Sequence, residues 1–410
     1  MLAYCASDTH VQFVHLRFGS RKQAFSLYVK CLIETTMSRL MVDSPYKPCC
    51  IPSMNTTHDV IIAGASFAGI TCARTLAKRG LRVCVLERKE NVRHSIHTTG
   101  ILVHEAYDLL KPPEYLVRKI RSVKLYSPSM KHVDVSSTDY TFYVTDTPAL
   151  MEWMVAEAKK DGVEIRLNTP FEKAEQADDT IRVNDSLFCH FLIGADGARS
   201  RVAEQFGLGK NTQFLTGVEV EMSGITHRDD ALYCLLDSIT ARGYIGWAFP
   251  TVGGITQIGI ACNDKAKPEI KVMMDLAAQW FDMKDAHIVA RRGGLIPVGG
   301  VVTPFMKDNV ILVGDAAGMV SPLTAGGIHT ALHYGAMVAE KIADHVLSHA
   351  PHPSVSLRGL YPKFGYKHVL RIIMDIGIPN AIMEMTLFSN WFKRLASFVF
   401  FSRKSGTVLR

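Results

Sequence analysis

Small residues and one acidic residue form the first pattern that could do chemistry. The turn comprises Gly64, Ala65, Ser66, Phe67, Ala68 and Gly69. It follows the apolar run 60–63, and Glu87 and Arg88 follow the next apolar run, residues 81–86. Small residues let the backbone approach a pyrophosphate, which the amino end of the following helix stabilises. Glu87 is placed to accept hydrogen bonds from a ribose. The pattern predicts that the turn, Glu87 and Arg88 bind a dinucleotide.

Two later segments are apolar runs that end in an acidic turn. Residues 192–200 carry Asp196, and residues 310–318 carry Gly314 and Asp315. Ligands of parallel sheets lie at the carboxyl ends of the strands, so carboxylates there are well placed to bind ligand hydroxyl groups. We expect Asp196 and Asp315 to face the ribityl chain of a flavin.

A helix is expected to begin just after the second acidic turn. Its first residues are Gly326, Gly327 and Ile328. The amino end of a helix can aim N–H groups at the pyrimidine edge of a flavin, where negative charge accumulates on reduction. Because a nicotinamide enzyme needs neither acidic turn, the combined segments predict FAD, bound noncovalently. NAD(P)H or another reductant would be the external electron donor.

The elements that must position these residues alternate between strand and helix. Apolar residues at helical spacing predict a helix that Gly80 ends, between strands at 60–63 and 81–86. Further patterns predict a helix over 150–160, a strand over 163–167, paired strands over 243–249 and 255–261, and helix again from about 326. The fold class is therefore α/β, with a Rossmann-type FAD-binding domain, an interleaved, mainly β substrate domain and a helical carboxyl-terminal region.

Domain boundaries follow from the same elements. The FAD parts are expected at about 58–140, 180–210 and 290–345, and the substrate parts at about 141–179 and 211–289. Residues 346–410 form the helical region. Residues 1–57 form an extension that is either a basic targeting segment or dispensable, with Met54 as a plausible start.

The three segments together resemble the flavoprotein superfamily of aromatic-ring hydroxylases, squalene epoxidases, flavin halogenases and geranylgeranyl reductases, over roughly residues 58–345. The geranylgeranyl reductases are the most similar subgroup. Trp247-Ala248-Phe249-Pro250, with Gly259 after eight further residues, resembles their substrate-pocket signature. The resemblance implies that Tyr244, Trp247 and Phe249 line a pocket for an apolar substrate.

The chain departs from the family pattern in three places. The signature tyrosine belongs two positions before the tryptophan, where Ile245 stands, and a step of one residue turns Tyr244 to the other face of a strand. The reductase segment Cys-x-x-x-Gly matches residues 96–100 without its cysteine, leaving Gly100 as the expected flavin contact. Thr147 replaces an arginine that many members place near the flavin.

Histidines are the remaining candidates for catalysis or metal binding. An imidazole at His97, beside the flavin, could deliver or remove a proton, although it could equally be a solvated loop residue. We expect His94 and His104 to be solvated. His329 and His333 lie four residues apart, but no third ligand is evident. The nine cysteines are scattered, so no metal site is predicted.

The resemblance to the geranylgeranyl reductases implies reduction of carbon–carbon double bonds in an isoprenoid or other apolar molecule. A hydride would leave reduced flavin N5 and a proton would reach the other carbon. The main alternative is an FAD monooxygenase that hydroxylates an apolar substrate. A second alternative is a flavin-binding module without turnover. A halogenase is disfavoured because its paired tryptophans would require tryptophan at Ile245.

Composition restricts the partners and the location. The net charge of +7 is mild, and no dense basic block interleaved with aromatic residues is present, so nucleic acid is not an expected partner. No apolar run of residues 366–403 is long enough to span a membrane. The aromatic residues of 388–401 recur near helical spacing beside Lys393 and Arg394, which predicts either a helix in a membrane interface or one packed on the substrate domain. We expect a cytoplasmic protein, with peripheral membrane contact as an option.

Overall fold

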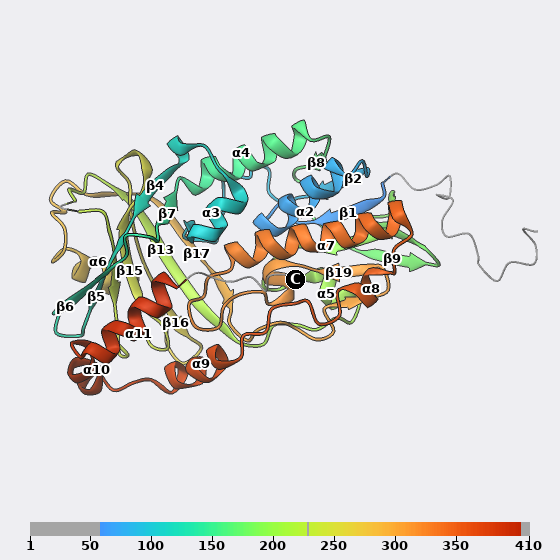
Figure 1. The fold of residues 1–410 in the computed structure, drawn as a ribbon. Helices are drawn as coiled ribbons and strands as arrows, with labels where there is room; N and C mark the ends of the chain where they lie inside the picture. The colour runs from blue at the N-terminus through green and yellow to red at the C-terminus, as the bar shows by residue number, and fades with distance from the viewer. Residues whose placement is uncertain (1–57, 228, 403–410) are drawn as a thin grey trace, which may run out of the picture. The chain divides into compact units, whose positions relative to one another are not determined.

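The computed structural model describes residues 58–227 and 229–402. The predicted extension, residues 1–57, lies outside these described residues. Three clusters of buried apolar side chains form the core. One lies around a parallel sheet, and the other two involve an antiparallel sheet farther along the molecule (Figure 1).

The first sheet contains the predicted dinucleotide-binding strands. Its order is β18 (Met306–Lys307), β19 (Val310–Leu312), β12 (Phe191–Gly194), β1 (Val60–Ala63), β2 (Val83–Leu86) and β8 (Glu164–Arg166). All pairs are parallel except the one formed by edge strand β18. Four strands of this sheet are buried and, apart from Gly194, wholly apolar: β1, β2, β12 and β19. Such strands suit a sheet that is covered by other elements. Helices α2 (Phe67–Lys78), α4 (Thr147–Lys160) and α7 (Ile328–Ser348) contribute buried residues to the same core.

The second sheet is mainly antiparallel. Its order is β17 (His287–Pro297), β13 (Phe214–Ser223), β16 (Thr256–Asn263), β15 (Gly246–Pro250), β14 (Ala231–Leu235), β5 (Ser122–Tyr126) and β6 (His132–Ser136). Strands β15 and β16 pair antiparallel across Gly253 and Gly254, as the sequence predicts. Smaller sheets are formed by β3 (Ile101–Leu102), β7 (Phe142–Thr145) and β4 (Val117–Ile120), and by β11 (Leu187–Cys189), β10 (Thr180–Val183) and β9 (Ala174–Ala177).

Short helices complete this part of the chain. They are α3 (His104–Leu110), α5 (Arg201–Gln205), α6 (Ile270–Ala277) and the single-turn η1 (Glu114–Leu116), η2 (Val252–Gly254) and η3 (Gly314–Ala317).

Strand pairing divides the chain differently from the predicted domain parts. Residues 141–179 were placed with the substrate domain, yet α4 packs against α2, and β8 pairs with β2 in the FAD sheet. Residues 122–136 were placed with the FAD domain, yet β5 and β6 extend the substrate sheet. Strand β17 also belongs wholly to that sheet, although 290 was the expected boundary. Hydrogen bonds between distant strands decide these assignments, and local apolar patterns do not report them.

Helices end the described chain. They are α8 (Pro353–Ser356), α9 (Tyr366–Ile376), α10 (Asn380–Leu387) and α11 (Asn390–Phe401). Helix α11 lies against β6, with Ala396 buried and Phe392, Phe400 and Phe401 packed on the core. Trp391 is 67% exposed and Phe398 54% exposed, so this helix packs through one side only. Among the described helices, none is both long and apolar enough to cross a bilayer.

Candidate functional site

The turn between β1 and α2 requires glycine at two positions. Gly64 has φ of +105°, and a Cβ there would lie 2.4 Å from the carbonyl oxygen of Ala195. A Cβ on Gly69 would lie 2.1 Å from the carbonyl oxygen of Gly64. Ser66, at the usual middle glycine, has φ of −85° and caps α2 by accepting a hydrogen bond from the Gly69 N–H at 3.2 Å. Serine therefore fits this position without strain.

Glu87 is fixed beside this turn at the carboxyl end of β2. Its carboxylate accepts the N–H of Ala65 at 2.8 Å and the N–H of Lys89 at 3.0 Å. A carboxylate oxygen has room for a second donor. Glu87 can therefore hold the turn and still bind a ribose hydroxyl group, as the sequence predicts.

The two acidic turns differ in how much of each carboxylate is free for a ligand. Asp196 accepts hydrogen bonds from the Ser200 hydroxyl at 2.6 Å and from the N–H groups of Arg201 and Val202 at 2.7 and 3.1 Å. These bonds serve the start of α5. Asp315 follows Gly314, whose φ is +60°, and burial raises the pKa of Asp315 to about 6. Asp315 is therefore the better placed of the two to gain stabilisation from ligand hydroxyl groups.

One cavity of about 580 Å³ connects these elements with the second sheet. Most of the predicted cofactor residues line it: Gly64, Ala65, Ser66, Phe67, Ala68, Glu87, Arg88, Asp196, Gly314, Asp315, Gly327 and Ile328. Gly69, Gly100 and Gly326 are not among the described residues that line the cavity. The role of each residue in binding the cofactor stays a prediction.

Gly100 has a packing role that the sequence did not predict. Its φ is +70°, and a Cβ there would lie 1.9 Å from the hydroxyl oxygen of Thr147. Thr147 is buried and hydrogen-bonds to the hydroxyl of Thr145 at 2.9 Å. The threonine that replaces the family's arginine therefore packs against the backbone of the 96–100 segment.

The three predicted pocket aromatics lie in different environments. Trp247 lines the cavity. Tyr244 donates a hydrogen bond to the carbonyl oxygen of Thr324 at 2.6 Å, and its ring meets that of Trp247 edge-on. Phe249 is fully buried in the core and, like Tyr244, is not among the lining residues. Of the three, Trp247 alone is positioned to touch a ligand in this cavity.

The side chain of Trp247 lies across a neighbouring strand to meet a buried carboxyl group. Trp247 of β15 pairs with Gly259 of β16, Gly259 pairs with Glu219 of β13, and Glu219 pairs with Arg292 of β17. A Cβ on Gly259 would lie 2.4 Å from the indole ring. Glycine there gives the indole N–H its path to Glu219, to which it donates at 2.9 Å.

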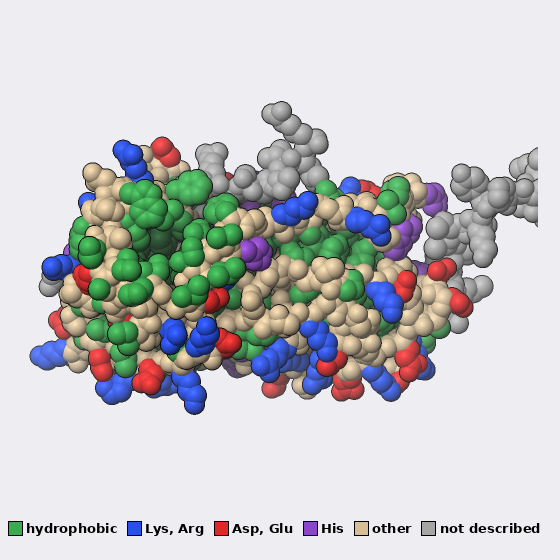
Figure 2. Space-filling view, turned by 90° about the horizontal axis from the view of Figure 1, so that it is seen from below, with side chains coloured by type: hydrophobic (Ala, Val, Ile, Leu, Met, Phe, Trp, Pro, Cys, Tyr) green, Lys and Arg blue, Asp and Glu red, His purple; other side chains and the backbone are tan. Residues whose placement is uncertain are grey.

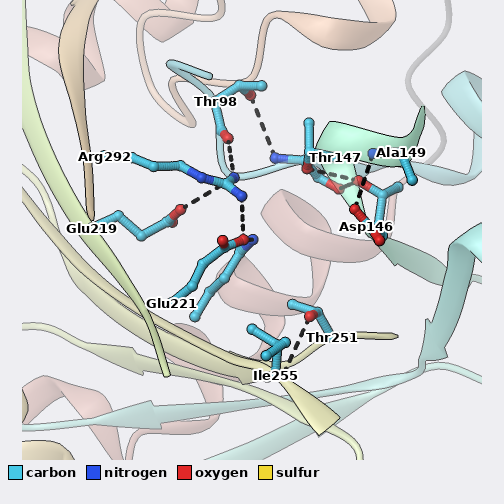
Figure 3. A network of polar contacts seen from close by, with 12 residues as sticks. Thr98, Asp146, Thr147, Ala149, Glu219, Glu221, Thr251, Ile255 and Arg292 are labelled. Atoms are coloured by element: carbon cyan, nitrogen blue, oxygen red, sulfur yellow. Dashed lines mark hydrogen bonds and ion pairs between the residues drawn. The ribbon is translucent and has the colours of Figure 1, made fainter. Parts of the chain in front are cut away.

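Glu219 and Arg292 line the same cavity and were not identified from the sequence. Figure 3 shows Arg292 between Thr98, Glu219 and Glu221. Glu219 is 5% exposed. Arg292 hydrogen-bonds to Glu221 and, at 3.3 Å, to the carbonyl oxygen of Thr98, but lies 3.8 Å from Glu219. Burial raises the pKa of Glu219 to about 7, although Trp247 and Arg292 act in the opposite direction. The sequence feature that could have pointed to this site is the pair Glu219 and Glu221, two acidic residues on the same face of one strand.

The histidines occupy separate places. The His97 ring is exposed beside the cavity, with Nδ1 2.7 Å from the carbonyl oxygen of Gly293, and its catalytic role stays a prediction. His94 is exposed, as expected. His104, at the start of α3, is half-buried: its ring packs beside Tyr140 and Tyr143 with Nδ1 buried, and its Nε2 lies 3.6 Å from Asp108.

In the described part of the chain, the side chains that could together bind a metal ion do not include His329 and His333. His329 and His333 stack at 6.1 Å. Among the described residues, the group close enough to hold an ion is His58, Cys84 and Glu164, and His58 already hydrogen-bonds to Glu164 at 2.7 Å.

The cavity fits FAD on structural grounds. Gly64 and Gly69 allow the tight backbone packing of the turn between β1 and α2, where a pyrophosphate can bind, and Glu87 adjoins this turn. The same cavity is lined by Asp315, by the amino end of α7 and by Trp247. These groups can serve the ribose, pyrophosphate, ribityl and ring portions of the cofactor.

Comparison with known proteins agrees with this geometry. The FAD binding domain family matches residues 57–244. The chain is 28% identical over 305 residues to digeranylgeranylglycerophospholipid reductase 3 of Methanosphaera stadtmanae, covering 70% of this chain and 77% of that protein. It is 26% identical over 303 residues to digeranylgeranylglycerophospholipid reductase of Methanocaldococcus jannaschii, with the same two coverages.

Solved structures share the fold. A geranylgeranyl bacteriochlorophyll reductase-like protein of Thermoplasma acidophilum aligns with a TM-score of 0.73 at 20% identity, covering 84% of this chain and 97% of that one. The flavin-dependent brominase Bmp2 aligns with a TM-score of 0.63 at 15% identity, covering 84% and 94%. The predicted α/β class and the predicted cofactor are confirmed. The chain carries an FAD-binding domain over residues 57–244 and is an FAD-dependent oxidoreductase.

Proposed function

We propose that this protein reduces carbon–carbon double bonds of an isoprenoid lipid or a similar apolar molecule. The observation that carries the proposal is the cavity itself, which runs from the glycine turn to Trp247. Relatives that align over 70% of this chain are named digeranylgeranylglycerophospholipid reductases. An apolar chain beside an indole ring would bury surface that water otherwise solvates poorly.

Different parts of the chain have different tasks in this reaction. Bound FAD supplies the hydride, because reduced flavins transfer hydride to carbon. The glycine turn and Glu87 hold the adenosine end, and Asp315 faces the ribityl chain. The amino end of α7 stabilises negative charge on the ring. Trp247 positions the double bond, and the second sheet keeps water out.

Anaerobic reoxidation tests this function. The FAD-loaded protein is reduced with dithionite and mixed with a geranylgeranyl lipid in the absence of oxygen, and flavin absorbance is followed. We expect reoxidation with the geranylgeranyl lipid and none with its fully saturated analogue. Reoxidation that requires oxygen and yields a hydroxylated lipid would instead identify a monooxygenase. No lipid dependence of any kind would identify a flavin-binding module without turnover.

We propose further that the carboxyl-terminal helices bring the protein to an anionic lipid surface. Figure 2 looks onto the side where α9 and α10 lie in Figure 1 and shows hydrophobic side chains gathered around a hollow. The exposed apolar side chains of this segment are Tyr366, Val369, Ile372, Ile373, Ile376, Ile382, Met385, Phe388, Trp391 and Phe398. Such a face, next to basic residues, suits a bilayer interface close to a lipid substrate.

The charges of this segment favour anionic headgroups. Lys393 and Arg394 are exposed on α11. The acidic residues between 366 and 402 are Asp375 and Glu384. Asp375 pairs with Arg371 at 2.9 Å, and Glu384 accepts the N–H of Ser129 at 2.6 Å. Arg371 neutralises Asp375, and Lys367, Lys393 and Arg394 outnumber Glu384, so the net charge of this segment is positive.

A further inference from the structure

Reduction of a double bond needs a proton as well as a hydride. One alkene carbon receives the hydride, and the electron pair of the π bond forms a C–H bond at the other carbon with a proton from an acid. The substrate gains two electrons and the cofactor loses two, which an external two-electron donor such as a nicotinamide must replace. An isoprenoid carries no acidic hydrogen, so the proton must come from a side chain of the cavity wall or from water inside the cavity.

Glu219 is a carboxyl group built into that wall at the middle of the second sheet. It lines the cavity, and its side chain is almost completely buried. Its Oε2 accepts the indole N–H of Trp247 at 2.9 Å. Its Oε1 has no hydrogen-bond partner among the described residues. A buried oxygen without a donor is where a carboxyl group would carry its proton.

We propose that Glu219 is the catalytic acid that protonates the substrate, an inference that rests on the reductase function proposed above. The carboxyl group gives its proton to the alkene carbon, and Glu219 becomes a carboxylate. The indole N–H of Trp247 already points at this group and stabilises the charge that remains. A proton from solvent restores the acid before the next turnover.

The charges around Glu219 keep it available as an acid. Arg292 approaches from β17, but it hydrogen-bonds to Glu221 and so is neutralised mainly by that residue. Gln257 of β16 also donates to Glu221, at 3.2 Å, and not to Glu219. With burial dominating, the pKa of Glu219 lies at about 7, where a group can both hold and release a proton at neutral pH. The Glu221 carboxylate therefore holds the Arg292 guanidinium away from Glu219, the proposed acid.

His97 is the competing acid at the same cavity. It approaches from the segment before β3, beside Gly294 of β17. Its ring is exposed, whereas the Glu219 side chain is buried beside Trp247. Water can reach His97 directly, whereas Glu219 is held beside Trp247, the aromatic residue proposed to position the substrate. The other cavity carboxyl group with a raised pKa, Asp315, belongs to the cofactor end. Variants of His97 and Glu219 therefore separate the two assignments.

Infrared spectroscopy of the FAD-loaded protein tests whether Glu219 holds a proton. We expect a protonated carboxyl band in the wild type that disappears between about pH 6 and 8 and is missing from Glu219→Gln. In Glu221→Gln the band should disappear at lower pH, because Arg292 is freed to interact with Glu219. A wild-type spectrum in which Glu219→Gln removes no carboxyl band would overturn the proposal, whether or not the lipid is reduced.

Single-turnover kinetics test whether that proton is used. With reduced protein and the geranylgeranyl lipid, Glu219→Gln should slow anaerobic reoxidation at least about 100-fold, while the dissociation constants for FAD and lipid change little. Glu219→Asp should recover part of the rate. Unchanged rates in Glu219→Gln, or an equal loss in His97→Gln with the Glu219 band intact, would overturn the proposal. Failure of the wild type to reoxidise would instead count against the reductase function.

Discussion

The cofactor end and the substrate end of the cavity are built by opposite means. At the cofactor end, backbone atoms within one short turn determine the shape, and a Cβ at Gly64 or Gly69 has no room. At the substrate end, side chains from three strands meet across Gly259 of a fourth, and the row from Arg292 through Glu219 and Gly259 to Trp247 depends on strand register. The first design tolerates little variation, whereas the second can be changed one side chain at a time to suit another substrate.

A single added methyl group should therefore have its largest effect, on FAD affinity, at the cofactor end. Gly69→Ala places a Cβ against the carbonyl oxygen of Gly64, so the turn must shift. We expect a loss of FAD affinity equivalent to about 3 kcal/mol or more, measured by flavin fluorescence titration. Gly299→Ala is the matched control, because its Cβ would make only an ordinary 3.4 Å contact with Gln213. Equal FAD affinity in the two variants would refute this account of the turn.

Carboxylates at the cofactor end should divide into ligand-binding and structural ones. Asp315→Ala should weaken FAD binding by about 1.5–3 kcal/mol, because ribityl hydroxyl groups lose a charged acceptor. Ser66→Gly should cost only a few tenths of a kcal/mol, since glycine is also a good helix N-cap. Asp196→Ala should lower the melting temperature more than FAD affinity, because its carboxylate serves α5. Calorimetric titration and thermal melts of all three variants provide the check.

The substrate end should respond to pH through Glu219. Because folding raises the pKa of this carboxyl to about 7, the folded state binds its proton more tightly than the unfolded chain does. The resulting stabilisation is complete below the unfolded pKa and is lost as pH rises through about 7. Relative to Glu219→Gln, the wild type should lose on the order of 2 kcal/mol of unfolding free energy between pH 4.5 and 8. Urea unfolding at several pH values measures this difference, and parallel curves would contradict it.

The smallest effect is expected outside the cavity, on α11. Changing both Trp391 and Phe398 to Ser should reduce binding to anionic vesicles by roughly 1–3 kcal/mol, while the flavin spectrum and melting temperature stay unchanged. The control is Tyr115→Ser, since Tyr115 is 72% exposed in η1. Cosedimentation with vesicles of phosphatidylglycerol, compared with phosphatidylcholine, measures the binding. A large fall in melting temperature with vesicle binding intact would show that the helix packs through these residues.

Local patterns were sufficient to predict the cofactor end. Strand β1 coincides with the apolar run 60–63, and Gly80 follows directly after the residue that caps α2. Both features can be predicted locally, because the burial of a strand and the end of a helix depend on neighbouring residues. The substrate end was not predictable in the same way. Arg292 faces Glu219 through pairing of β17 with β13, and the intervening chain gives no local sign of that register. Family resemblance identified Trp247 but not its carboxyl partner.

The distant pairing of β5 with β14 and of β8 with β2 was missed for the same reason. An alternating strand such as 132–136 shows which residues face the core, but it does not show which sheet provides that core. The environment of His104 was also missed, because the tyrosines around its ring come from beyond the end of its own helix.

We propose that FAD bound at one end of this cavity serves reduction of a double bond at the other. The decisive experiment is the mass of the product formed aerobically under ¹⁸O₂, with the holoprotein, a chemical reductant and a geranylgeranyl lipid. We expect a lipid that has gained two hydrogen atoms for each double bond lost and contains no ¹⁸O. A product that keeps its double bonds and contains one ¹⁸O atom would identify a monooxygenase instead of a reductase.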